Sequence, residues 1–151
     1  LGHDLWTDEV AARQALAYVP EHPELAPYAT IGEVALLVAR LRGLGAAEAW
    51  DALARAGVEA LADRTVRELS MGQRRRALLA AAWIGSPRVL VLDEPLEAMD
   101  RATRAAIVDW VAERRGAGAA VLVATHEVEP FAPLVDRVLR VDGGSVAWGS
   151  M

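Results

Sequence analysis

The run Val-Leu-Val-Leu at residues 89–92 is followed directly by the adjacent carboxylates Asp93 and Glu94 and then by Pro95. Four aliphatic residues in succession leave no polar face, so the run predicts a strand buried on both sides, as in the centre of a parallel sheet. In an open parallel sheet, ligands collect beyond the carboxyl ends of the strands. Asp93 and Glu94 stand at such an end and are therefore candidate ligand-binding residues.

Strands and helices alternate in the second half of the chain. The strand at 89–92 follows a helix expected from about 72 to 84, and Asp100 is expected to cap the next helix. A second apolar strand is expected at 120–124 and reads as buried on both faces, and a strand–turn–strand unit is expected at 138–148. This order predicts an α/β fold in which a mostly parallel sheet is flanked by helices.

The first half of the chain has a different pattern. A short buried strand is expected at 16–19, and the stretch 21–29, which holds Pro23 and Pro27, is expected to be a loop. Helical segments then run from about 30 to 68, and Thr30 with Glu33 has the spacing of a capping box. This helical stretch interrupts the α/β pattern and predicts a subdomain.

Composition narrows the classes of function. The chain has no cysteine, which excludes disulfides and thiolate metal sites. Its net charge of -5, with 21 acidic residues against 16 arginines, argues against a nucleic-acid-binding protein. The only dense basic run, 74–76, is interpreted as a partly solvated helix start. No apolar run reaches the length of a membrane span, and the first residues do not resemble a signal peptide.

Three groups of residues could act on a phosphate. The carboxylates Asp93 and Glu94 could hold Mg²⁺ and orient a water molecule, and His126 after the strand at 120–124 could hydrogen-bond a terminal phosphate. Ser70 and Gly72 at a helix start offer a hydroxyl and free N–H groups to an anion. Each also has a plain structural interpretation: a solvated turn, a structural histidine and an ordinary helix cap.

The order of these parts resembles that of the ATP-binding-cassette ATPases, the nucleotide-binding subunits of ABC transporters. Residues 69–73 match four of the five positions of their signature motif, Leu-Ser-Gly-Gly-Gln, with Met71 in place of the first glycine. Residues 89–94 resemble the Walker B strand, and 96–100 resemble the D-loop. His126 aligns with the switch histidine, and 18–21 resembles the entry to the Q-loop with Glu21 at the glutamine position. The resemblance runs from Gly2 to Trp148.

The resemblance implies a role for each matching residue. Glu94 would be the catalytic base and His126 would contact the terminal phosphate, while Asp93, with Glu21, would bind Mg²⁺. The residues implied to bind nucleotide, in the site of a partner domain, are Ser70, Gly72, Gln73 and Asp100. The implied substrate is ATP, with Mg²⁺ as cofactor.

The resemblance also implies an architecture. Residues 1–151 would be part of a P-loop NTPase-like domain, with a helical and signature subdomain at about 30–85 and an α/β core formed by 1–29 and 86–151. The chain contains no lysine, so the glycine-rich phosphate-binding loop that ends in Lys-Ser/Thr cannot lie within it. The fold is therefore expected to be incomplete at its N-terminus, and the chain alone is expected to be inactive.

The implied partners are a second ATPase domain, identical or different, and a transmembrane permease subunit, with no nucleic acid. The expected location is the cytoplasm, at the membrane through the permease. Two other interpretations remain open from the residues. One is an ABC-type ATPase of DNA repair or translation. The other is a degenerate cassette that only dimerises or docks, which Met71 favours and the intact Asp93, Glu94 and His126 oppose.

Overall fold

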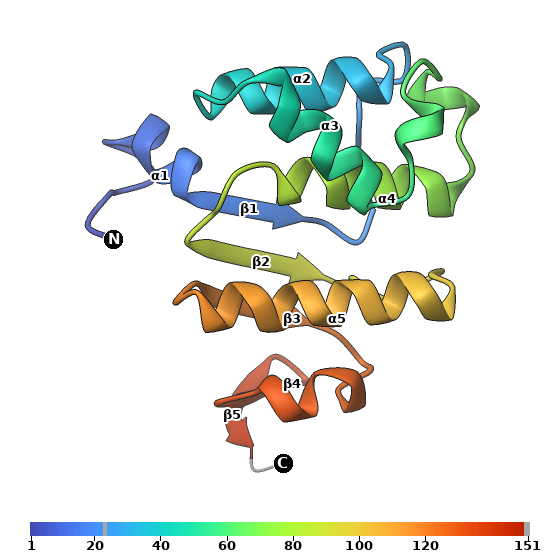
Figure 1. Cartoon of the computed structure of the whole chain (residues 1–151). Coiled ribbons are helices and arrows are strands. Elements are labelled where there is room, and N and C mark those ends of the chain that lie inside the picture. The colour runs from blue at the N-terminus through green and yellow to red at the C-terminus, as the bar shows by residue number, and fades with distance from the viewer. Residues whose placement is uncertain (23, 150–151) are drawn as a thin grey trace.

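A parallel three-stranded sheet forms the centre of the molecule (Figure 1). The computed structural model describes residues 1–22 and 24–149, so Pro23 of the expected loop lies outside the described residues. The strands β1 (Leu16–Val19), β2 (Val89–Asp93) and β3 (Ala120–Ala124) lie in the order β1-β2-β3. Both pairings are parallel, so the predicted α/β fold is confirmed and all three strands end at the same edge.

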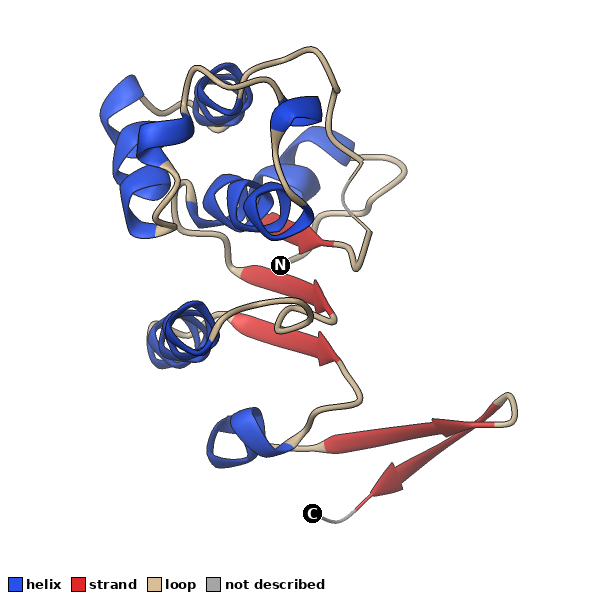
Figure 2. Cartoon of the chain, turned by 90° about the vertical axis from the view of Figure 1, so that its right-hand side faces the viewer, coloured by secondary structure: helices blue, strands red, loops and turns tan. Residues whose placement is uncertain are grey.

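Helices pack on this sheet, as the turned view in Figure 2 shows. The α-helices are α1 (Glu9–Ala15), α2 (Ile31–Leu41), α3 (Ala46–Arg55), α4 (Met71–Trp83) and α5 (Arg101–Gly116). Short 3₁₀ turns lie at Glu59–Leu61, Val66–Glu68 and Glu129–Leu134, and the chain continues as an antiparallel hairpin of β4 (Val138–Asp142) and β5 (Ser145–Gly149). Helix α4 packs on β1, and α5 packs on β3.

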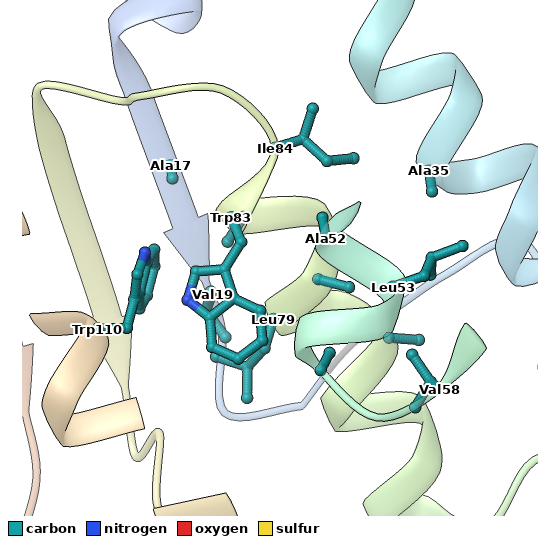
Figure 3. Packing of buried hydrophobic residues seen from close by; sticks show 14 of the residues in the cluster. Ala17, Val19, Ala35, Ala52, Leu53, Val58, Leu79, Trp83, Ile84 and Trp110 are labelled. Atoms are coloured by element: carbon teal, nitrogen blue, oxygen red, sulfur yellow. The ribbon is translucent and has the colours of Figure 1, made fainter. Parts of the chain in front are cut away.

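One face of the sheet is the main core. Val19, Leu90 and Leu92 are fully buried there against the helices. Trp83 of α4 and Trp110 of α5 meet edge to face, with ring centroids 5.4 Å apart and ring planes at 83° (Figure 3). Such aromatic pairs add stability beyond the area they bury. This contact fixes α4 and α5 relative to one another and to the strand that carries the carboxylates.

The opposite face of the sheet is largely uncovered. Tyr18, Val91 and Leu122 lie in register across the three strands, and Tyr18 and Leu122 are 53% and 57% exposed. The sequence predicted that 120–124 is buried on both faces, and this is wrong: alternate residues of β3 are exposed. The physical reason is that none of the described elements covers Tyr18 and Leu122. The buried environment expected of a two-faced apolar strand exists on one side only.

The helical stretch after β1 begins as the sequence predicts. Thr30 Oγ1 accepts a hydrogen bond from Glu33 N at 3.1 Å, and a Glu33 carboxylate oxygen accepts one from Thr30 N at 2.8 Å, which completes the capping box. Small residues line the buried side of α2, whereas Leu37 and Leu41 are 56% and 66% exposed. Leu37 and Leu41 therefore face outward, whereas Leu36 and Val38 are partly buried against the core. Helices α2 and α3 pack on each other and on α4.

Candidate functional site

The candidate site lies where β2 ends. Asp93 is the last residue of β2 and pairs with Ala124 of β3, and Glu94 N donates a hydrogen bond to Ala124 O at 2.8 Å. Glu94 has a φ of +43°, a left-handed conformation that is uncommon for residues with a side chain. The chain therefore turns sharply directly after the strand, at the second of the two carboxylates.

The Glu94 carboxylate is held by the residues that follow β3. Thr125 Oγ1 donates to one carboxylate oxygen at 2.9 Å, and His126 N donates to the other at 3.0 Å. His126 Nδ1 lies 2.9 Å from that same oxygen. The Glu94 side chain is 19% exposed and the His126 ring is 71% exposed. The structure therefore brings together Glu94 and His126, which lie 32 residues apart in the sequence.

These contacts shift the pKa values of Glu94 and His126. Burial alone raises the pKa of Glu94, but the hydrogen bonds from His126 and Thr125 outweigh it and hold the pKa below the ordinary value of 4.5. The hydrogen bond to Glu94, together with its negative charge, raises the pKa of His126 above 6.5. A carboxylate with a depressed pKa is a weak proton acceptor. Glu94 would therefore have to leave this arrangement, or exchange some of these bonds, before it could take a proton from a water molecule.

The two candidate Mg²⁺ ligands lie at this same edge. Val19 of β1 pairs with Leu92 of β2, so Glu21, two residues beyond β1, follows the strand next to Asp93. Carboxylate oxygens suit Mg²⁺, which binds one or two of them and completes its shell with water and phosphate oxygens. Among residues 1–22 and 24–149, no group of three or more histidine or acidic side chains gathers closely enough to hold a metal ion. Asp93 and Glu21 have the carboxylate oxygens that Mg²⁺ prefers and follow neighbouring strands, and their role as its ligands stays a prediction.

The start of α4 is formed by local hydrogen bonds. Gln73 N donates to Ser70 Oγ at 3.3 Å, and Ser70 N donates to Gln73 Oε1 at 2.9 Å, so the predicted cap is a full capping box. Met71 is 68% exposed and points away from the core. A Cβ added to Gly72 would meet only Ala98 O, at an ordinary distance of 3.6 Å. Nothing among the described residues therefore requires a glycine at position 72.

Asp100 has a similar local role at the start of α5. Its carboxylate accepts hydrogen bonds from Thr103 N and from Thr103 Oγ1, both at 2.9 Å. These bonds lower the pKa of Asp100 below its ordinary value. Asp100 is exposed and follows the turn that carries Glu94. The predicted cap is confirmed, and the geometry alone requires no further role for this residue.

Sequence reasoning missed Arg75. The run 74–76 was expected to be partly solvated, and for Arg75 this is wrong: its side chain is 2% exposed. Arg75 Nη2 donates to Asp93 O at 3.4 Å and to Glu94 O, and Nη1 donates to Glu97 Oε2 at 2.9 Å. Helical spacing carries the signal that could have found it, because Arg75 shares a face with the buried Leu79.

A second arginine also contacts this turn. Arg104 of α5 donates to Leu96 O at 3.2 Å and forms an ion pair with Glu127, the residue after His126. Arg104 therefore links the turn after β2 to the segment after β3. This link could not be predicted from the sequence, because the partners lie 8 and 23 residues away from Arg104.

Comparison with known proteins identifies the family. The profile of the ABC transporter family matches residues 2–97. The chain is 41% identical over 110 residues to the aliphatic sulfonates import ATP-binding protein SsuB 2 of Agrobacterium fabrum, which covers 69% of the chain and 42% of that protein. It is 36% identical over 149 residues to the daunorubicin resistance ATP-binding protein DrrA3 of Streptomyces coeruleorubidus, which covers 96% of the chain and 47% of that protein.

The fold agrees with these matches. A solved structure titled as an ATP binding subunit of an ABC transporter superposes with a TM-score of 0.89 at 25% identity, over 99% of this chain and 65% of that one. The chain belongs to the ABC transporter family, and it resembles the ATP-binding proteins of that family. It spans less than half the length of the two bacterial relatives. No helix among the described residues combines the length and apolar character that crossing a bilayer requires.

Proposed function

We propose that the whole protein binds and hydrolyses ATP and that it drives transport through a separate membrane permease. The observation that carries this proposal is the contact between Glu94 and His126 beside Asp93, at the carboxyl edge of a parallel sheet. A carboxylate at such an edge can hold a metal ion against phosphate oxygens, and a second can orient a water molecule. The names of the bacterial relatives, one for import and one for drug resistance, favour transport over repair or translation.

Each residue at the strand ends would have a separate role in ATP hydrolysis. Asp93, with Glu21 beside it, would bind Mg²⁺, which when bound neutralises charge on the phosphate oxygens. Glu94 would orient the attacking water and accept its proton. His126 would hold Glu94 in place before ATP binds and then contact the terminal phosphate. The exposure of His126 supports this role because its ring can reach a ligand without a change in the core.

The start of α4 would serve the nucleotide of a second ATPase domain, identical or different, in a head-to-tail pair. Its N–H groups and the positive end of the helix dipole favour an anion, and Gly72 adds no side chain that would hinder the approach of a ligand. The residues proposed for this contact are Ser70, Gly72, Gln73 and Asp100. The helical part at about 30–85 would contact the permease, and 1–29 with 86–151 would belong to the α/β core. The protein would then act in the cytoplasm, at the membrane.

The decisive experiment replaces Glu94 by glutamine in the whole protein. Glu94→Gln keeps the shape of the side chain and an oxygen acceptor but cannot take a proton. We expect kcat for ATP hydrolysis to fall by about 10²–10⁴-fold, the usual contribution of a general base, while ATP binding persists. Glu129→Gln, at an exposed carboxylate in the 3₁₀ turn after His126, is the matched control and should hydrolyse ATP normally.

Two results would argue against the proposal. Normal turnover by Glu94→Gln would remove Glu94 from the role of base. Failure of the wild-type whole protein to bind Mg-ATP, measured by calorimetry, would remove the ATPase function itself.

A further inference from the structure

The turn from 93 to 98 rests on the first two turns of α4. Arg75 lies beneath this turn, and its guanidinium donates to the carbonyl oxygens of Asp93 and Glu94 and to the Glu97 carboxylate. It is the only charged residue that is fully buried among the residues the structure describes. The planar fork of an arginine can donate to several acceptors at once, which a lysine ammonium does less well. The burial and the three contacts indicate that Arg75 holds this turn.

The backbone of the 93–98 turn is strained and requires contacts that stabilise it. Glu94 and Ala98 have φ values of +43° and +56°, so two residues with side chains adopt the left-handed region within five positions. Such conformations cost energy and persist only where the surroundings fix them. Ala98 O also lies against Gly72, three residues before Arg75 on the same helix. The helix start and the strained turn are therefore in contact at two points, one backbone and one side chain.

Burial of the Arg75 guanidinium costs free energy. A buried guanidinium loses its hydration, and Arg75 Nε has no hydrogen-bond partner among the described residues. The Glu97 side chain that pairs with Arg75 is 48% exposed, so the ion pair is only partly shielded from water. An apolar residue here would fit the buried face of α4 shared with Leu79. What an apolar residue could not do is bind the Asp93 and Glu94 carbonyls.

We propose that Arg75 is a positioning residue of the ATPase. It holds the 93–98 turn on α4, so that the Glu94 carboxylate stays aimed at Thr125 and His126. The same helix begins with Ser70, Gly72 and Gln73, which are proposed to face the partner's nucleotide. Arg75 therefore also connects this helix start to the turn that carries Glu94. The kinetic part of this inference rests on the proposed function, whereas its structural part does not.

The first test compares Arg75, near the start of α4, with Arg42, the C-cap of α2, which contacts the other end of α4. Arg42 donates to Leu16 O at 3.3 Å and to Ile84 O, the C-cap of α4, so it is also partly buried and binds two carbonyls, but far from Glu94 along α4. In the whole protein, Arg75→Met should lower kcat for ATP hydrolysis by about 10²-fold with KM for ATP nearly unchanged, as expected when a reacting group is displaced. Arg42→Met should leave kcat within about twofold of wild type among folded molecules.

The second test does not require hydrolysis. Amide hydrogen exchange of the whole protein, read by mass spectrometry, should be faster over residues 94–99 in Arg75→Met and unchanged there in Arg42→Met. If Arg75→Met does not fold, Arg75→Lys replaces it, with a smaller change in the same direction because a lysine can bind one of the carbonyls but not all the acceptors.

The outcomes separate the two proposals. Unchanged exchange over 94–99 in the Arg75 variants would overturn the positioning role, whether or not the protein is an ATPase. Equal losses of kcat in Arg75→Met and Arg42→Met would reduce Arg75 to a structural contact. The wild-type protein could fail to hydrolyse ATP while amide exchange over 94–99 becomes faster in the Arg75 variants and not in Arg42→Met. In that case the proposed function is wrong, but Arg75 still positions the 93–98 turn.

Discussion

The two parts of the proposed nucleotide site are built in different ways. At the start of α4, Ser70 and Gln73 bind each other across three residues, and the helix start is exposed. At the end of β2, Glu94 is held by Thr125 and His126, which follow it by 31 and 32 residues. The helix start is thus formed by residues close together in the sequence, whereas the contacts of Glu94 at the strand end form only when β2 and β3 pair. We therefore expect substitutions in the core to disturb the strand end far more than the helix start.

The largest effect on stability should come from the strand that carries the carboxylates. Leu92→Ala removes a side chain that is fully buried beside Asp93. It should lower the free energy of unfolding by about 2–5 kcal/mol, since a cavity remains in the core. Met71→Ala, at an exposed position on the helix start, should change it by no more than about 0.5 kcal/mol. Urea unfolding of both variants measures the contrast, and similar losses in the two would contradict it.

A smaller effect is expected at the helix start itself. Ser70→Ala removes the N-cap acceptor of Gln73 N and should cost about 1 kcal/mol in urea unfolding. The loss should be non-additive with Gln73→Ala, because each variant breaks the same capping box. Strict additivity in this double-mutant cycle would mean that the two side chains act separately. Both side chains lie within about one helical turn of each other, so the effect is confined to the helix start.

Features formed by residues close together in the sequence could be predicted from it, whereas features formed by distant residues could not. The caps at Thr30, Ser70 and Asp100 were predicted correctly because each depends on residues about three positions away. The locations of the apolar strands were also predicted correctly, because short runs of aliphatic residues are typical of strands in a parallel sheet. The exposure of one face of β3 was missed, because it depends on which elements are present to cover Leu122.

The buried arginine shows why the remainder of the site could not be predicted. Arg75 lies in a run of three arginines, and only the folded position of the 93–98 turn gives it acceptors for hydrogen bonds. Arg104 likewise finds its partner Glu127 only when α5 packs beside the end of β3. That Glu94 and His126 would act in one site was expected from the family resemblance. The hydrogen bonds that join them come from the geometry of the parallel sheet.

The smallest expected effect is a pH dependence of stability at the strand end. The pKa of Glu94 is held below 4.5, so its contribution to stability is present above pH 4.5 and is lost as the pH falls through the depressed value. The pKa of His126 is raised above 6.5, so its contribution is present below pH 6.5 and is lost as the pH rises through the raised value. Both groups are therefore charged and paired between about pH 4.5 and 6.5.

The test compares wild type with His126→Ala by urea unfolding at acidic, intermediate and alkaline pH. The difference in unfolding free energy should be greatest between pH 4.5 and 6.5 and smaller on both sides, and it should shrink in high salt because the His126 ring is exposed. Asp136→Ala, which breaks the exposed ion pair with Arg115, is the control and should show no maximum in that window, since neither partner titrates there. A difference for His126→Ala that is constant with pH would mean that Glu94 and His126 do not form a charged pair. The strand end would then depend on packing and neutral hydrogen bonds alone, as the helix start does.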